Sequence, residues 1–294
     1  MKKNEIPSID LVQIHKKDFG FQIVNNREIL LNDELKHNPF RPHRIRFYAI
    51  LFIKEGTGIH SIDFKDYIYK RGSVIFISKE QVHAFEKNME RKALFLLFTE
   101  EFLEKESLGS NLMQQLSLYN YHLYPPVINL HEKELVVFSE LLDLLKLEFD
   151  SANDLLTEEI MHSSLKIFLC LAERIRKRNQ KLKPRSKYLD EFLRFQKLLT
   201  LNIQKTRKVK AYAEELLISS KKLNRITQEI SGKPAKGYIN EFLIVEIKRL
   251  LMNPAFSIKE VAHQSGFEET TNFVKYFKKQ VGKNPSEFRV QFGV

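Results

Sequence analysis

The spacing of apolar residues changes once along this chain, from the spacing typical of strands to that typical of helices. Of all the sequence features, this change constrains the fold class most strongly. Between about residues 40 and 100, short β-rich runs alternate with turn residues, whereas beyond about residue 130 apolar residues recur every three or four positions. Strands followed by helices are typical of α+β proteins. A length of 294 residues accommodates two cores, so the sequence predicts an α+β chain with two folded units.

The first part predicts a small β-barrel or sandwich. Lys54-Glu-Gly-Thr-Gly58 supplies two glycines for a hairpin turn, and Gly72 marks another turn. Closure of such strands would protect their edges and leave an interior able to hold a ligand. The β-rich runs are 47–53, 59–64, 67–69, 74–77 and 93–98.

Two amphipathic helices are predicted between residues 131 and 176. Their apolar residues follow helical spacing, and 150–154 forms a short polar connection that suits an antiparallel pair. We interpret the pair as a dimerisation segment; the alternative is that the helices only cover the barrel. The single cysteine, Cys170, excludes an internal disulfide, and its apolar surroundings predict a buried structural thiol.

The excess of positive charge in this protein lies entirely in residues 181–294. The formal net charge is +11, and residues 181–294 hold 23 Lys and Arg against 11 Asp and Glu. A basic region of this kind binds polyanions, either nucleic acid or an anionic membrane surface. The run 174–187 carries eight basic residues and one proline, which predicts a cationic linker with little apolar surface for a membrane. No apolar segment is long enough to span a bilayer, and the first residues lack the apolar region of a secretory signal, so we expect a cytoplasmic protein.

The basic part shows the pattern helix, turn, helix twice. In the second instance Ser257 and Glu260 form a capping box, and Gly266 permits a left-handed turn before the helix that follows. That helix is predicted to bury Phe273, Phe277 and Val281, which are spaced four residues apart. The helix 238–252 between the two instances is apolar on most sides and is predicted to be buried. Polar side chains that can hydrogen-bond base edges occupy the outer faces of both second helices: Lys221, Lys222, Asn224, Arg225 and Gln228 in the first, and Thr270, Thr271, Asn272, Lys275 and Lys279 in the second.

These residues resemble the DNA-binding domain of the AraC/XylS family of transcription regulators. The resemblance implies a sequence-specific DNA-binding regulator that acts as an activator with RNA polymerase as its partner, and it implies no catalytic role. The first turn departs from the family pattern, because Leu217-Ile218 contains no glycine. The matching positions are 213–225, Gly232, Tyr238, 247–251, 257–262, Gly266-Phe267, Phe273, 276–279, Gly282, Pro285 and Phe288-Arg289.

The resemblance also assigns base-reading positions and domain limits. Base reading would fall on Ser220, Lys221, Asn224 and Arg225 in the first unit and on Thr270, Thr271, Asn272 and Lys275 in the second. The expected domains are a regulatory barrel at 1–130, a helical dimerisation segment at 131–176, a basic linker at 177–187 and the DNA-binding domain at 188–294.

The first half is similar to the small cupin-like barrel that many members of this family carry. The stretch 72–83 matches its glycine-to-histidine hairpin, and His60 and His83 are expected to meet inside the barrel. Two histidines without a third ligand favour hydrogen-bonded core residues over a metal site, so we expect no metal and no cofactor. The barrel would bind a small-molecule effector or a partner. The alternatives are a purely structural barrel in a ligand-independent regulator, and a cupin enzyme with an accessory basic domain.

Overall fold

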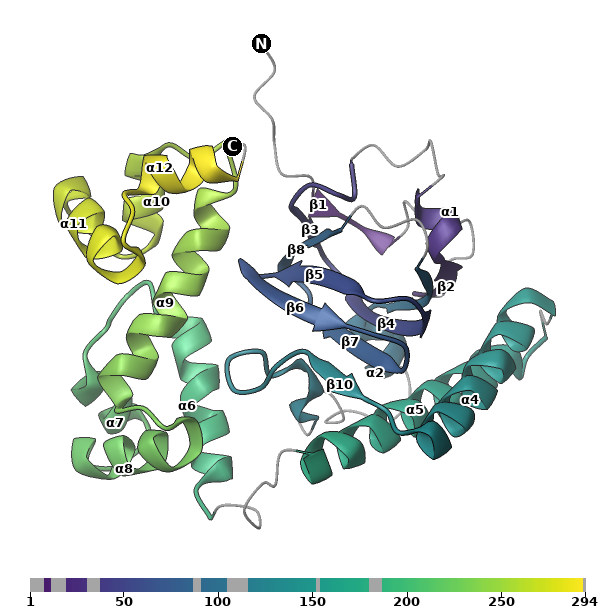
Figure 1. Cartoon of the computed structure of the whole chain (residues 1–294). Helices are drawn as coiled ribbons and strands as arrows, with labels where there is room; N and C mark the ends of the chain where they lie inside the picture. Colours follow the sequence, from purple (N-terminus) through teal and green to yellow (C-terminus); the bar gives the residue numbers. More distant parts are fainter. Residues whose placement is uncertain are drawn as a thin grey trace. The chain divides into compact units, whose positions relative to one another are not determined.

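The structure, a computed structural model, confirms the α+β organisation. It describes residues 8–11, 20–30, 38–86, 91–104, 116–151, 154–179 and 187–292. These residues form two compact units, an N-terminal unit within 7–181 and a C-terminal unit within 182–294 (Figure 1). The predicted linker falls mostly on 180–186, which lies outside the described residues.

The N-terminal unit is built on two five-stranded sheets. All strand pairs are antiparallel except β1 with β3, and the described strands form two separate sheets in place of one closed barrel. The first sheet has the order β1 (Ser8–Ile9), β3 (His43–Ile45), β8 (Val82–Phe85), β5 (Gly58–Ile62), β6 (Lys65–Tyr69). The second has the order β10 (Val127–Asn129), β7 (Ser73–Ile77), β4 (Tyr48–Glu55), β9 (Lys92–Phe98), β2 (Phe21–Asn25). Short helices connect these strands. α1 (Asn26–Leu30) follows β2, α2 (Glu100–Glu104) follows β9, and η2 (Ser117–Tyr119) precedes β10.

The second sheet is buried on both faces, which explains why its strands are apolar throughout. Leu51 and Ile53 on β4 point into the core between the sheets, while Ile50 and Phe52 point into the core beneath the helices. A strand covered on both sides needs no polar face, so its sequence does not alternate. β5, in contrast, exposes Ile59 and belongs to a sheet with one solvated face.

Two long helices cover the outer face of the second sheet. These are α4 (Glu132–Ser151) and α5 (Thr157–Asn179), and Phe138 and Phe168 meet between them with ring centroids 4.7 Å apart. The two helices therefore cover the sheet, as the alternative to a dimerisation segment expected. α5 runs to Asn179, so residues 177–179, expected in the linker, form its last turn.

The prediction of a buried thiol at Cys170 is wrong, because the structure exposes this cysteine. Phe168, Leu169 and Ala172 of α5 are fully buried against the sheet. Cys170 lies between them in sequence but on the opposite face of the helix, since residues one or two positions apart do not share a helical face. The apolar run 167–171 thus crosses from one face of α5 to the other.

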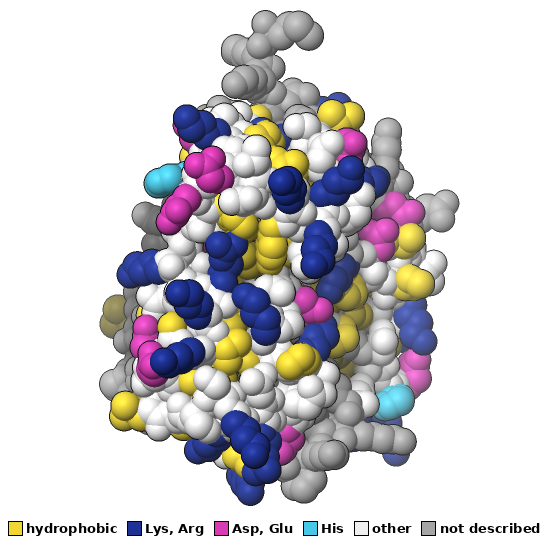
Figure 2. Space-filling view, turned by 90° about the vertical axis from the view of Figure 1, so that its left-hand side faces the viewer, with side chains coloured by type: hydrophobic (Ala, Val, Ile, Leu, Met, Phe, Trp, Pro, Cys, Tyr) yellow, Lys and Arg dark blue, Asp and Glu magenta, His cyan; other side chains and the backbone are white. Residues whose placement is uncertain are grey.

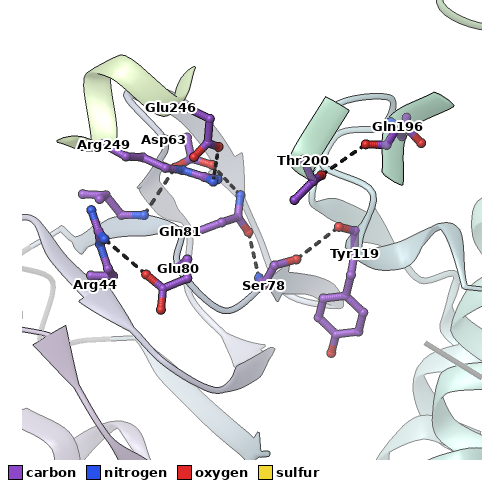
Figure 3. A network of polar contacts seen from close by, with 11 residues as sticks. Arg44, Asp63, Ser78, Glu80, Gln81, Tyr119, Gln196, Thr200, Glu246 and Arg249 are labelled. Carbon is purple, nitrogen blue, oxygen red and sulfur yellow. Dashed lines mark hydrogen bonds and ion pairs between the residues drawn. The ribbon is translucent and has the colours of Figure 1, made fainter. Parts of the chain in front are cut away.

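The turn between β7 and β8 is held by hydrogen bonds from side chains. Glu80 adopts a positive φ of 67°, and the Gln81 carboxamide accepts from the Ser78 N–H at 2.7 Å and donates to Asp63 at 2.6 Å (Figure 3). The Ser78 hydroxyl donates to the Tyr119 carbonyl at 3.1 Å. These bonds tie the turn to both the β5–β6 hairpin and η2.

The C-terminal unit is entirely helical in its described residues. Its core includes Phe192, Phe195, Tyr212 and Tyr238, whose rings contact one another edge-on or tilted. No helix among the described residues of either unit has the length and hydropathy needed to cross a membrane. The helices are α6 (Leu189–Asn202), α7 (Val209–Glu215), α8 (Ser220–Ser231), α9 (Ala235–Leu251), α10 (Ile258–Gln264), α11 (Thr270–Val281) and α12 (Pro285–Gln291).

Candidate nucleic-acid interface

The first helix-turn-helix unit consists of α7 and α8. Leu217 occupies the left-handed region between them with a φ of 57°, and the N–H of Ile218 donates to the Ala213 carbonyl at 3.0 Å. Ser219 then caps α8 by accepting from the Lys222 N–H at 3.1 Å. Leu223 and Ile226 are fully buried, so the opposite face of α8 is turned outward.

The second unit, α10 and α11, repeats this backbone. Gly266 has a φ of 74°, and the N–H of Phe267 donates to the Ala262 carbonyl at 3.0 Å. The predicted capping box between Ser257 and Glu260 is confirmed, with bonds of 2.6 and 3.1 Å. Phe273 and Phe277 of α11 are fully buried, as predicted.

Buried contacts hold the two units together. Ile239, Ile247 and Leu251 of α9 are inaccessible to solvent, which confirms the prediction for this helix. The segment after α6 also reaches the second unit, because the Arg207 guanidinium lies 4.0 Å from the centroid of the Phe267 ring. Arg207 further donates to the Gly266 carbonyl at 3.4 Å.

The four positions predicted on α8 differ in their surroundings. Lys221 and Arg225 are exposed, and Ser220 is half-buried. The Asn224 side chain is engaged by the backbone on both ends: its Nδ2 donates to the Ser220 carbonyl at 3.0 Å, and its Oδ1 accepts from the Ala235 N–H at 2.9 Å. Asn224 thus fastens the start of α9 to α8, a contact that its position in the sequence does not reveal.

Three of the four positions predicted on α11 lie at its outer face, and the fourth, Thr270, lies on the same side as the buried Phe273 and Phe277. Thr271, Asn272 and Lys275 are exposed, and Thr270 at the start of the helix is half-buried. Their side chains comprise hydroxyl, amide and ammonium groups, which include both donors and acceptors for base edges. The structure therefore gathers Thr271, Asn272 and Lys275 on the outward face of α11, with Thr270 at its start.

Basic side chains surround both outer faces. Figure 2 looks onto the left-hand side of Figure 1, where blue Lys and Arg side chains are widely spread. Lys222 is paired with Glu191 at 3.0 Å, so it is partly neutralised. The exposed cations of α8, α11 and their flanks are Lys221, Lys222, Arg225, Lys233, Lys236, Lys275, Lys278, Lys279 and Lys283. This distribution suits a phosphate backbone.

The sequence analysis missed three residues that position these helices. Besides Arg207, Arg289 of α12 donates to the carbonyls of Leu251, Asn253 and Phe256 at 2.7, 3.2 and 2.5 Å. Burial lowers the pKa of Arg289. Lys236 of α9 donates to the Arg207 carbonyl at 3.0 Å, and burial followed by the Arg207 charge lowers its pKa. The sequence signal for this role is a basic residue in the helix that follows each helix-turn-helix unit, Lys236 in α9 and Arg289 in α12.

The interior of the N-terminal unit holds a histidine cluster. His60 and His83 meet as predicted, with ring centroids 5.3 Å apart, and His43 joins them at 4.1 Å from His83. The expectation of a hydrogen-bonded residue is wrong for His60, because its two ring nitrogens have no hydrogen-bond partner among the described residues and the rings of His83 and Phe85 lie beside it. Burial, then Arg91 and His43, lowers the pKa of His60 to about 3. No group of three or more metal-ligating side chains among the described residues is arranged to hold a metal.

Two family profiles match the chain, one in each unit. The AraC-like ligand binding domain matches residues 33–165, and a helix-turn-helix domain matches residues 212–291. The second range contains both helix-turn-helix units and all eight predicted base-reading positions.

Several known proteins are also similar to this chain. The chain is 22% identical over 268 residues to the HTH-type transcriptional activator RhaS of Salmonella schwarzengrund, covering 89% of this chain and 91% of RhaS. Crystallised ToxT of Vibrio cholerae O395 aligns with a TM-score of 0.45 and 18% identity over 94% of this chain and 99% of ToxT. An AraC-type regulator of Chromobacterium violaceum aligns with 33% of this chain and 88% of its own, at 21% identity and a TM-score of 0.31. With its ligand-binding and helix-turn-helix profiles in this order, the chain belongs to the AraC family of transcription regulators.

Proposed function

We propose that this regulator activates transcription by binding a specific DNA sequence as a homodimer, under the control of a small molecule bound to its N-terminal unit. The observation that carries the proposal is the repeated helix-turn-helix backbone with polar side chains on both outer faces. Two such helices, each presented on a buried scaffold, suit two segments of major groove. The name of RhaS as an activator supports the direction of regulation.

Base reading is the first step to test. The eight positions proposed to read bases are Ser220, Lys221, Asn224, Arg225, Thr270, Thr271, Asn272 and Lys275. Arg225 is the best probe among them, because it is exposed and can bond guanine O6 and N7 in two-pronged fashion. Asn224 can read a base only by releasing backbone bonds.

Selection of bound duplexes from a random pool with the full-length protein tests this step. We expect enrichment of a motif with two segments about one helical turn apart, roughly 34 Å. Arg225→Ala should lose about 1 to 3 kcal/mol of binding free energy and relax one base position. Lys205→Ala, outside both outer faces, serves as a matched loss of one charge. Binding without enrichment, equal for both variants, would contradict sequence-specific reading.

The outward faces of α4 and α5 support dimerisation. Each helix exposes apolar side chains at i, i+7 and i+10, a spacing that places them along one stripe. A second copy of the chain would cover these stripes and remove apolar area from water. The residues are Val137, Leu144 and Leu147 on α4, and Ile160, Ile167 and Cys170 on α5.

Cys170 supplies its own test of the dimer. As the single cysteine it can be joined to a second copy by a short bismaleimide, with Cys170→Ser as the unreactive control. We expect a cross-linked dimer at micromolar protein and a monomer for Ile167→Asp, which places a charge in the proposed interface. Equal cross-linking before and after the Ile167 substitution would exclude this interface.

Effector control rests on the match of residues 33–165 to a ligand-binding domain. The regulator needs no catalytic step: a ligand that prefers one arrangement of the dimer shifts the population toward it and changes DNA occupancy. Contact with RNA polymerase would complete activation. Transcription from a promoter that carries the selected motif, measured with purified polymerase, tests this contact.

A further inference from the structure

The end of α5 holds a buried cation whose donors are only partly used. Arg176 is 1% exposed, and its Nη1 donates to the Pro125 carbonyl at 2.8 Å. Its Nε and Nη2 are buried and find no hydrogen-bond partner within the described ranges. Burial lowers the pKa of Arg176 to about 10, so the group remains charged at neutral pH. Unsatisfied buried donors on a charged group are costly and call for an occupant.

The nearest carboxylate is already engaged elsewhere. Glu173, one turn earlier on α5, accepts from the Ser117 N–H at 2.9 Å and from the Ser117 hydroxyl at 2.8 Å. It also pairs with Lys177 at 3.3 Å. Glu173 therefore acts on Arg176 only through its field, and the open edge of the guanidinium needs another acceptor.

A third unused donor lies beside the same aromatic ring. The Tyr119 hydroxyl is buried and lacks a hydrogen-bond partner in the described part of the chain. The Arg176 guanidinium carbon lies 5.6 Å from the centroid of the Phe76 ring, and the Tyr119 ring centroid also lies 5.6 Å from it. Burial, the largest effect, raises the pKa of Tyr119, so its hydroxyl remains a protonated donor. Tyr48 and Phe98 pack around this tyrosine.

This donor set defines the chemistry of its occupant. Nε and Nη2 lie on one edge of the planar guanidinium and present parallel N–H groups, a geometry that two carboxylate oxygens match. The tyrosine adds a third donor, and the surrounding aromatic rings favour an apolar body. We propose that Arg176 and Tyr119 form the recognition site for a small organic carboxylate, which acts as the effector. This inference rests on the proposed function, because it names the ligand class of the regulator.

The position of the site couples it to the DNA-binding unit. Arg176 lies in the last turn of α5, which ends at Asn179, and the C-terminal unit begins at Leu182. Glu173 and Arg176 already fasten α5 to residues 117–125. A carboxylate at Arg176 adds a bond at this point and stabilises the arrangement from which the chain leaves the N-terminal unit.

Ligand-dependent melting of the full-length protein tests the site. The probes are acetate, butyrate and benzoate, each compared with its uncharged amide at constant ionic strength. We expect a saturable rise in the melting temperature with at least one carboxylate and none with its amide. Arg176→Met should weaken that affinity more than tenfold and Tyr119→Phe three- to tenfold. Lys177→Met, an exposed cation on the same turn, should keep the wild-type affinity.

Three results would overturn the site: equal shifts by the amides, no saturable shift by any of the three carboxylates, or wild-type affinity in both variants. The second would mean that buried water satisfies the donors. If Arg176→Met does not fold, Tyr119→Phe decides, since it removes only one hydroxyl. Selection of DNA with and without the carboxylate separates the proposals. A selected motif without carboxylate binding overturns this site alone. Carboxylate binding with no motif under either condition overturns the DNA-binding proposal alone.

Discussion

The two helix-turn-helix units reach the same backbone with different residues. Each turn has a left-handed residue followed by an N–H that donates back into the first helix, but this residue is Leu217 in one unit and Gly266 in the other. The surroundings explain the difference. Leu217 is 91% exposed, whereas a Cβ at Gly266 would lie 2.1 Å from the Gln204 carbonyl oxygen. Glycine is therefore required only where the backbone of another segment approaches.

The helices that follow the two units also differ in how they are fastened. Lys236 reaches one carbonyl before the first unit, and Arg289 reaches three before the second. Conversely, Asn224 secures the helix after the first unit, while the corresponding place in α11 is taken by Val274. Arg289, in the helix after the second unit, fastens that unit, whereas Asn224, in the recognition helix α8 itself, fastens the first.

The largest effect on the difference between the two units is expected for Gly266→Ala. We expect a loss of about 3 to 4 kcal/mol in the free energy of unfolding of the C-terminal unit, since the new Cβ must displace backbone in a strained conformation. Gly282→Ala is the matched control, because it has a φ of 83° but no atom within 4 Å. Urea denaturation followed by circular dichroism measures both; equal losses would show that only the positive φ matters.

Arg289→Ala should cost more than Lys236→Ala. The first leaves three carbonyls without their charged donor, for a loss of about 2 to 3 kcal/mol, and the second leaves one, for less than about 1 kcal/mol. Hydrogen exchange of the α10 and α11 amides should rise in the Arg289 variant only. A larger effect for Lys236 would reverse the stated difference between the units.

Asn224→Ala and Arg225→Ala separate fastening from reading on one helix. Asn224→Ala should lower the free energy of unfolding by about 1 kcal/mol, because the Ala235 N–H loses its acceptor. Arg225→Ala should leave stability within about 0.5 kcal/mol, as expected for an exposed residue. Paired melting curves and binding curves check this. Unchanged stability in Asn224→Ala would argue that its two backbone bonds are weak.

The smallest effect is expected for Leu217→Gly, which should raise the free energy of unfolding, whereas the other variants lower it or leave it nearly unchanged. Removing the strain of a non-glycine residue at positive φ outweighs the added chain entropy, so the variant should gain about 0.5 kcal/mol. The exposed side chain contributes no burial that could be lost. A lower melting temperature would show that Leu217 makes a contact in the native state that outweighs its strain.

The sequence predicted the parts that rest on local rules. The capping box at Ser257, the turn at Gly266 and the inner face of α11 are local patterns, and all three occur. The sequence shows β4 as an unbroken apolar run, which is consistent with burial on both faces. Periodicity alone cannot predict which elements cover these faces.

What the sequence could not predict depends on long-range contacts. Arg289 bonds carbonyls more than thirty positions earlier, and His43 reaches His83 across the first sheet. Cys170 was misplaced because an apolar run in a helix does not mark which side faces the core. The unused donors of Arg176 appear only once its neighbours are in place.

The length of α5 has a mechanical consequence. At 1.5 Å per residue, its 23 residues form a rod of about 35 Å. A rotation of about 5° at one end of such a rod moves the other end by about 3 Å. The apolar stripe at Ile160 and Ile167 and the buried guanidinium at Arg176 lie at different heights on this rod. A slight tilt about the Ile160 end of this rod is therefore largest at the Arg176 end, which is where the chain leaves α5 toward its basic part.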